Sequence, residues 1–202
     1  MLISKLSFTV LPDFLKSENL KQEHRLIMSL FPEATTAEPR NEYGVLYRKE
    51  QDAYGNIYYI IQSNIAPDVS NIANQQLSVT TTLQTKEIEN LYTSLLQRET
   101  FSYKIRINPV KVNGKKRIAV TNISDILEWW EKKAAYHGID IQIDALSIVK
   151  ERAPYYAQSV PISTVTIAGK ASAHDRQKAI TSIADGIGKE KSYGYGLLLL
   201  GS

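Results

Sequence analysis

The chain has 202 residues, of which 43% are hydrophobic and 22% are charged, a balance typical of a globular protein with one large or two small domains. It has no cysteine, which excludes a disulfide framework, a thiolate nucleophile and a zinc–cysteine site. No stretch has the apolar length that a membrane helix needs, and the start, MLISKLSFTVLPDF, lacks the apolar core of a signal peptide. We therefore expect a cytoplasmic protein.

The formal net charge of +3 is divided unevenly along the chain. Residues 1–95 carry 8 basic and 11 acidic side chains, a balance of −3, whereas residues 96–202 carry 16 and 10, a balance of +6. Within the second part, the stretch FSYKIRINPVKVNGKKRIAVTNIS (101–124) holds six basic residues and no acidic one. This asymmetry indicates a polyanionic partner for one face, although a solvated, lysine-rich hairpin would give the same pattern.

The first half of the chain has the signals of a β-α-β-β-(α)-β order, which is typical of a ferredoxin-like domain. Residues 2–11 alternate as a strand does, and Ser17 is placed to cap a helix that runs to about Phe31, just before Pro32. The later elements that we expect are strands at 44–49 and 56–63, a short helix or irregular loop within 64–77, and a strand at 78–85.

The second half repeats this order. Residues 101–107 alternate between apolar and polar side chains, and Asn113-Gly114 favours a tight hairpin that returns through 115–120. The later expected elements are a helix at 122–136, strands at 139–149 and 163–169, a helix capped by Asp175, and a last strand at 194–200. We therefore predict an α+β protein with tandem ferredoxin-like (RRM-like) domains and antiparallel sheets, covering residues 1–95 and 96–202.

Four of the ten glycines lie between Gly186 and Gly196, in the stretch GIGKEKSYGYGLLLL. The cluster follows a helix, so it is neither a Walker A loop nor a Rossmann fingerprint, and a dinucleotide-binding enzyme is disfavoured. A glycine-rich loop that also carries Lys189, Lys191 and Ser192 can bind an anion through its backbone N–H groups, or it can be a structural turn. The residues leave both alternatives open.

None of the three histidines lies at metal-ligand spacing from another or within a HExxH motif, so we expect no metal site and no cofactor. His24 falls on the inward stripe of its predicted helix with Leu20 and Ile27, which by itself favours a histidine of the core. His137 adjoins the C-terminal end of a helix, where a structural role is expected. His174 lies in a polar loop.

Four stretches, taken in order, resemble a known family. EHRLIMSLFP (23–32) places His24 at a fixed distance from a Leu-Phe-Pro sequence, and IRINPVK (105–111), IVKERAPYY (148–156) and the glycine-rich stretch (186–200) follow. Together they are similar to the CasE subfamily of the repeat-associated RNA-binding superfamily. These endoribonucleases cut CRISPR precursor RNA in type I-E systems and remain as subunits of the Cascade surveillance complex. The glycine-rich stretch alone would indicate only the superfamily.

The resemblance implies an RNA stem-loop bound to two ferredoxin-like domains and cleaved without a metal ion. In this chemistry the ribose 2′-OH attacks the adjacent phosphodiester, and a 5′-OH and a 2′,3′-cyclic phosphate result. His24 matches the family's catalytic histidine, and histidine is readily tuned for proton transfer near neutral pH. One helical turn earlier, where some members carry tyrosine, this chain has Lys21, which either stabilises the phosphorane as a second catalytic group or is a solvated helix residue.

The implied partners are the CRISPR repeat stem-loop and the other Cascade subunits, with no membrane. Arg25 resembles a phosphate ligand of the family, although an exposed helix arginine is the alternative. A lysine-rich hairpin suits the phosphates and 2′-hydroxyls of helical RNA. The expected RNA-binding residues are Arg25, Lys104, Arg106, Asn108, Lys111, Lys115, Lys116, Arg117 and Arg152, together with Gly186, Gly188, Lys189, Lys191, Ser192, Gly194 and Gly196. A guide-RNA-binding subunit that does not cut is the alternative function.

Overall fold

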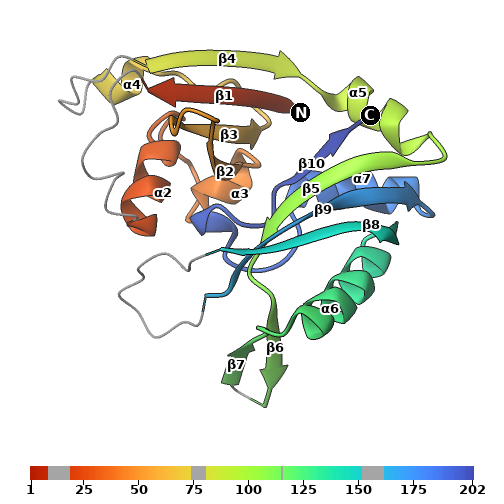
Figure 1. The fold of residues 1–202 in the computed structure, drawn as a ribbon. Coiled ribbons are helices and arrows are strands. Elements are labelled where there is room, and N and C mark those ends of the chain that lie inside the picture. Colours follow the sequence, from red (N-terminus) through yellow and green to blue (C-terminus); the bar gives the residue numbers. More distant parts are fainter. Residues whose placement is uncertain (9–18, 74–80, 115, 152–161) are drawn as a thin grey trace. The chain divides into compact units, whose positions relative to one another are not determined.

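The chain forms two compact units (Figure 1). Unit 1 comprises residues 1–89 and 192–194, and unit 2 comprises residues 90–191 and 195–202. No helix among the described residues combines the length and the apolar sequence that a membrane-spanning helix needs. The computed structural model describes residues 1–8, 19–73, 81–114, 116–151 and 162–202.

Unit 1 contains a four-stranded antiparallel sheet with the strand order β2-β3-β1-β4. The central strand β1 pairs on one side with β3, where Leu6 lies opposite Tyr59, and on the other side with β4, where Leu6 lies opposite Leu83. This order is that of a ferredoxin-like domain, as predicted. The elements are β1 (Leu2–Phe8), α2 (Leu20–Met28), α3 (Pro39–Glu42), β2 (Leu46–Gln51), β3 (Ile57–Ser63), α4 (Ser70–Ala73) and β4 (Thr81–Glu87).

The core of unit 1 lies between this sheet and α2. Leu6, Tyr59 and Ile61 are fully buried on the sheet, and Leu26 and Ile27 bring the apolar side of α2 against them. Burying one such side chain stabilises the fold by about 1.5–3 kcal/mol. The packing therefore fixes how α2 is turned about its axis, and with it the direction in which His24 leaves the helix.

Helix α2 is shorter than the predicted helix of residues 17–31, whose expected cap lies outside the described residues. The helix is capped by Asn19, whose side-chain oxygen accepts hydrogen bonds from the backbone N–H groups of Lys21 (3.1 Å) and Gln22 (3.2 Å). It ends at Met28, and the two apolar residues before the proline are buried beyond its end. Asparagine caps a helix as well as serine does, so the start after Asn19 follows the same capping rule that placed the predicted start at Ser17.

Unit 2 contains a four-stranded antiparallel sheet with the order β10-β5-β9-β8, and a separate hairpin, β6–β7. Numbered within the unit, this order repeats that of unit 1, so the predicted tandem ferredoxin-like fold is confirmed. The elements are α5 (Glu89–Leu96), β5 (Phe101–Ile107), β6 (Val110–Asn113), β7 (Lys116–Ala119), α6 (Ile123–Tyr136), β8 (Ile139–Glu151), β9 (Thr164–Ala173), α7 (Arg176–Asp185), the 3-10 turn η1 (Lys191–Tyr193) and β10 (Leu198–Gly201). The first residue of α5 and the last two residues of η1 belong to unit 1.

Helix α7 has its predicted cap, and helix α6 is capped by the residue at which its predicted range begins. The side chain of Asn122 accepts a hydrogen bond from the Ser124 N–H (2.9 Å) at the start of α6, and that of Asp175 accepts one from the Lys178 N–H (3.0 Å) at the start of α7. Strand β5 is buried at every second residue, as its alternating sequence predicts. The last strand was predicted at residues 194–200, but the observed strand β10 begins only at Leu198, and the residues before it form a loop. Helices α3 and α5 were not predicted.

The β6–β7 hairpin is attached to α6 at its base. The indole N–H of Trp129 donates a hydrogen bond to the carbonyl oxygen of Val110 (3.1 Å), and the N–H of Val120 donates one to Pro109 (2.9 Å). At the tip, Gly114 has a φ of +60°, in the left-handed region that a tight hairpin turn favours. The predicted hairpin is therefore present, and its base is fixed to the helix that follows it.

His137 lies at the C-terminal end of α6, with its Nδ1 atom 2.7 Å from the hydroxyl oxygen of Ser182. Burial of the ring, followed by the positive charges of Lys133, Lys191 and Lys178, lowers the pKa of His137 to about 4. The folded protein therefore holds this imidazole in its neutral form down to acidic pH, whereas an unfolded chain protonates it near pH 6.5.

We expect the thermal unfolding midpoint to fall as the pH is lowered from about 6.5 to about 4. In this window the unfolded state binds a proton at His137 that the folded state does not bind, so protonation favours unfolding. Replacing His137 with glutamine removes this contribution and makes the pH dependence shallower. Differential scanning calorimetry of both proteins between pH 4 and pH 8 measures the difference, and parallel curves would refute the assignment.

Candidate active site

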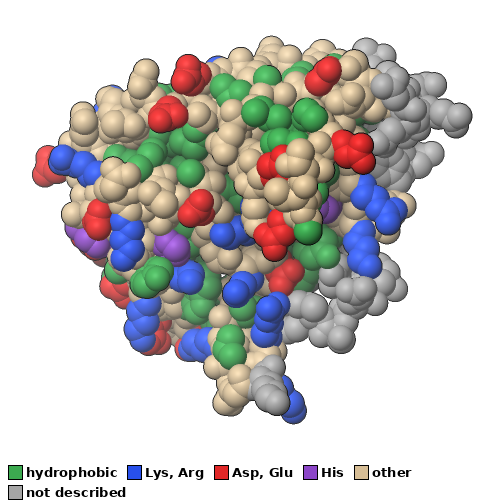
Figure 2. Space-filling model, turned by 180° about the vertical axis from the view of Figure 1, so that it is seen from behind, with side chains coloured by type: hydrophobic (Ala, Val, Ile, Leu, Met, Phe, Trp, Pro, Cys, Tyr) green, Lys and Arg blue, Asp and Glu red, His purple; other side chains and the backbone are tan. Residues whose placement is uncertain are grey.

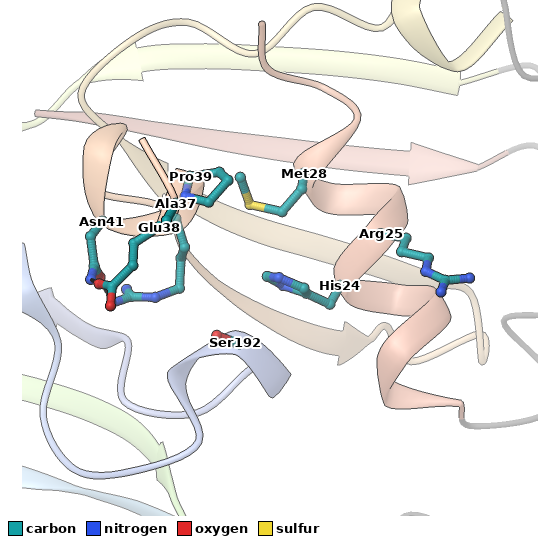
Figure 3. A pocket seen from close by; sticks show the side chains of 9 residues that line it. His24, Arg25, Met28, Ala37, Glu38, Pro39, Asn41 and Ser192 are labelled. Atoms are coloured by element: carbon teal, nitrogen blue, oxygen red, sulfur yellow. Dashed lines mark hydrogen bonds between the residues drawn. The ribbon is translucent and has the colours of Figure 1, made fainter. Parts of the chain in front are cut away.

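A pocket of about 600 Å³ opens in unit 1 (Figure 3). It is lined by His24, Arg25 and Met28 of α2, by residues 37–41 in and before α3, and by Ser192 of η1. Figure 3 shows the imidazole of His24 pointing from α2 into the space between α3 and Ser192, whereas the side chain of Arg25 extends away from that ring. The predicted catalytic histidine is therefore accessible from this pocket.

The imidazole of His24 is half-buried between two tyrosine rings. Its ring centroid lies 6.4 Å from that of Tyr47, with the planes 23° apart, and 6.5 Å from that of Tyr193, with the planes 72° apart. Its Nδ1 atom is buried and has no hydrogen-bond partner among the described residues. Burial and, secondly, the positive charge of Arg40 lower the pKa of His24. The ring is therefore neutral at pH 7 and able to accept a proton.

The segment 192–194 reaches the site through Tyr47 of β2. The Tyr47 hydroxyl donates a hydrogen bond to the carbonyl oxygen of Ser192 (2.8 Å). Gly194 has a φ of +83°, and a Cβ atom at this position would lie 3.3 Å from the Tyr47 ring. Glycine therefore allows the chain to pass close to the tyrosine, and the same passage brings Tyr193 to the edge of His24.

Arg40 is a residue of this pocket that was not predicted from the sequence. From α3, its Nη1 atom donates a hydrogen bond to the carbonyl oxygen of Val45 (3.2 Å), and its Nη2 atom donates one to the Asn41 side chain. Asn41 in turn donates to the carboxylate of Glu38. No spacing rule connects Arg40 with His24, because the two residues belong to different helices and meet only through the tertiary fold.

The two other residues predicted on α2 lie in different surroundings. Arg25 is exposed at the edge of the pocket. Lys21, the predicted second catalytic group, is exposed one turn before His24 and is not among the residues that line the pocket. The structure thus brings His24 and Arg25 to one pocket and leaves the Lys21 side chain outside its lining.

The basic residues predicted on β5 are partly engaged within unit 2. Arg106 forms an ion pair with Glu151 (2.9 Å) and lies over the Tyr195 ring, 5.4 Å from its centroid. Asn108 is 1% exposed, and its side-chain oxygen accepts a hydrogen bond from the Ser163 N–H (2.9 Å). Asn108 continues the alternation of β5 on the side of Lys104 and Arg106, but β5 ends one residue earlier and the amide turns inward, so its predicted contact with RNA stays a prediction for a side chain that is buried here.

The β6–β7 hairpin carries several exposed basic residues, and it projects at the bottom of the space-filling view with lysine and arginine side chains on and near it (Figure 2). Lys111, Lys116 and Arg117 are exposed on its two strands, and Arg117 forms an ion pair with Glu190 (3.1 Å). Lys104 is half-buried on β5. The predicted RNA contacts Lys115 and Arg152 lie outside the described residues.

The glycine-rich loop is held together by its own backbone. All four glycines, Gly186, Gly188, Gly194 and Gly196, have positive φ angles. The N–H of Ile187 donates a hydrogen bond to the carbonyl oxygen of Gly196 (2.9 Å). The loop is thus a structural turn in this structure, and anion binding by its backbone stays a prediction.

The lysines of this loop differ in their surroundings. The Nζ atom of Lys191 donates a hydrogen bond to the carbonyl oxygen of Asp185 (2.8 Å), whereas Lys189 is exposed. Across the described part of the chain, no three histidine, aspartate or glutamate side chains are grouped as metal ligands would be.

The two units define a tandem ferredoxin-like protein, and the pocket lined by the neutral imidazole of His24 and by Arg40 is a candidate site for proton transfer. The model of a protein family described as CRISPR associated protein matches residues 3–201. The chain therefore belongs to this family of CRISPR-associated proteins. A comparison with curated protein sequences finds no match.

Solved structures of CRISPR proteins share this fold along the whole chain. The CRISPR endoribonuclease Cse3 bound to a 19-nucleotide RNA has a TM-score of 0.80 and 18% identity, and the match covers 100% of this chain and 99% of that one. Cas6e from Escherichia coli K-12 has a TM-score of 0.71, 22% identity and coverages of 100% and 99%. A chain of a CRISPR RNA-guided surveillance complex has a TM-score of 0.65, 21% identity and coverages of 100% and 99%. The resemblance inferred from four short stretches is confirmed in family and fold.

Proposed function

We propose that the protein is a metal-independent endoribonuclease that cleaves CRISPR precursor RNA at the repeat stem-loop. The observation that carries this proposal is His24, whose imidazole is neutral at pH 7 and points into an open pocket that Arg40 also lines. The fold shared with a Cse3 chain that is named an endoribonuclease and is bound to RNA supports the proposal.

In the proposed reaction, the neutral imidazole of His24 accepts the proton of a ribose 2′-OH. The 2′-oxygen attacks the adjacent phosphorus, the bond from phosphorus to the 5′-oxygen breaks, and the leaving oxygen takes up a proton. The products are a 2′,3′-cyclic phosphate and a 5′-OH. A positioned general base contributes about 10²–10⁴-fold to such a rate. Lys21 stays the proposed second group, and its long side chain would have to turn towards the phosphorane when RNA is bound.

The proposed RNA-binding residues lie in each of the two units, as one RNA-contacting group of unit 1 and one of unit 2. Arg25 lies at the edge of the pocket as a phosphate ligand, and Lys111, Lys116 and Arg117 extend along the hairpin. Phosphate contacts of this kind release counterions, so affinity falls as salt rises. We further propose that the cleaved RNA stays bound and that the protein is a Cascade subunit, which the shared fold with a chain of a surveillance complex supports.

The test is to incubate the purified protein with its repeat RNA in EDTA and to analyse both new ends. We expect a 5′ end that polynucleotide kinase labels directly, and a 3′ end that resists periodate until the cyclic phosphate is opened with acid and the resulting monophosphate is removed by a phosphatase. The matched control is an RNA with a single 2′-deoxyribose at the cleavage position, which should bind equally well and remain uncut. Cleavage of this control, or a requirement for a divalent ion, would refute the proposed chemistry.

A guide-RNA-binding subunit without nuclease activity is the second candidate. The observation that favours it is the position of Lys21, outside the lining of the pocket where a second catalytic group is expected. This candidate predicts tight binding of the repeat hairpin and no product when the protein is in large excess over the RNA. The same incubation therefore distinguishes the two functions.

A further inference from the structure

We propose that Arg40 is a further catalytic residue of the His24 pocket, which binds the reacting phosphate of the RNA and stabilises the negative charge that develops on it. The inference rests on the proposed function, because it assigns a role within the same reaction. The inference adds a cationic residue of α3 to the site, whereas the site residues predicted from the sequence in this part of the chain lie only on the helix that carries His24.

The first argument is the place of Arg40. It lines the same pocket as His24 but comes from α3, so the two side chains approach the space from different elements. A space of about 600 Å³ is within the range of pockets that enclose a small ligand, and can hold a phosphodiester with its flanking sugars. A phosphate that reaches His24 through this pocket therefore passes the guanidinium.

The second argument is how Arg40 is held. Its hydrogen bonds to the carbonyl oxygen of Val45 and to the side chain of Asn41 fix the guanidinium on the wall of the pocket. A guanidinium presents five N–H donors in a planar fork, which matches two oxygens of one phosphate. Asn41 also donates to the carboxylate of Glu38, the acidic residue of the lining, and this bond orients the carboxylate. Arg40 is thus arranged before any RNA binds.

The third argument is electrostatic. Burial and, secondly, the positive charge of Arg40 lower the pKa of His24, so the guanidinium acts on the imidazole within this pocket before RNA binds. Other charged or titratable groups that contact the ring, line the pocket or adjoin His24 on α2 are Tyr47 on β2, Tyr193 on η1, Glu38 before α3, and Glu23 and Arg25 on α2, and Glu23 is paired with Lys49 (2.7 Å). A fixed cation beside the imidazole keeps the base deprotonated and also attracts the phosphate that it serves.

The test compares Arg40→Gln and Arg40→Lys with Arg98→Gln, which removes the same charge from an exposed position in unit 2. The first measurement is an NMR titration of the His24 imidazole without RNA. Arg40→Gln should raise the pKa of His24, whereas Arg40→Lys and Arg98→Gln should leave it near the wild-type value. A structural role of Arg40 that did not involve its charge would not distinguish glutamine from lysine in this way.

The second measurement is single-turnover cleavage of the repeat RNA. Removing one group that stabilises a transition-state charge costs about 10²–10³-fold in rate. We expect a loss of this size for Arg40→Gln, partial recovery for Arg40→Lys and no loss for Arg98→Gln, with affinity for the uncut 2′-deoxy RNA changing by much less. Thermal unfolding of each variant verifies that α3 is intact.

The outcomes separate this inference from the function on which it rests. If the wild-type protein cuts, an unchanged rate in Arg40→Gln overturns the inference and leaves the nuclease in place. If the wild-type protein binds the 2′-deoxy RNA but never cuts the natural one, the nuclease proposal fails. Arg40 is then assessed by affinity alone, where a loss of about tenfold in Arg40→Gln, worth about 1.4 kcal/mol, supports a phosphate contact and no loss refutes it.

Discussion

Replacing His24 with alanine should reduce the single-turnover rate of repeat-RNA cleavage by about 10²–10⁴-fold, because the variant loses the group that accepts the 2′-OH proton. In the wild-type protein, the rate should rise with pH as the imidazole loses its proton and should level off above its pKa, which burial and Arg40 hold below the usual value. The alanine variant should lack this rise. Quenched-flow or manual-quench assays from pH 4.5 to pH 8 measure both effects.

Two variants control for folding and for the loss of any histidine. His24→Gln keeps most of the volume of the ring beside Tyr47 and should be as inactive as the alanine variant. His174→Ala removes a histidine of unit 2 that is paired with Asp140 (3.0 Å), and should cleave at the wild-type rate. A His24→Ala protein that binds RNA normally and cuts within threefold of the wild-type rate would exclude His24 as the general base.

Replacing Gly196 with alanine should destabilise unit 2 more than the same change at Gly188. Gly196 has a φ of +86°, and a Cβ atom there would lie 2.7 Å from the carbonyl oxygen of Ile187. Gly188 has a similar φ of +97°, but a Cβ atom there meets nothing within 4 Å. A left-handed conformation costs an L-residue about 1–2 kcal/mol, so the free energy of unfolding falls by this amount in both variants. In Gly196→Ala it falls further, because the new Cβ atom clashes with the backbone of Ile187.

Urea denaturation of the two glycine variants measures the difference. The midpoint should fall for both proteins and should fall further for Gly196→Ala. The backbone around Gly196 has little freedom to move, because its N–H donates a hydrogen bond to the backbone carbonyl oxygen of Arg106 (2.8 Å) and its carbonyl oxygen accepts one from the N–H of Ile187 (2.9 Å). Equal losses of stability would show that the loop relaxes and that the clash is not decisive.

The sequence alone predicted those secondary-structure elements that depend on residues close together in the chain. Strand β5 follows from its alternating side chains, helix α7 begins after the aspartate that was expected to cap it, and helix α6 begins within one residue of its predicted start. These features depend on residues within one turn or one strand, so the sequence states them directly. The spacing of His24 from the Leu-Phe-Pro stretch indicated the family, and the fold agrees.

The tertiary structure alone decided which distant residues share the pocket. Arg40 reaches the lining with His24 from another helix, and Ser192 reaches it through the hydroxyl of Tyr47, 145 positions away in the chain. The inward turn of Asn108 also had no local signal, since its place in the alternation put it on the accessible side. The periodicity of a helix or strand predicts which of its sides is apolar. Which other element packs against that side depends on the packing of the whole domain, which no short stretch of sequence contains.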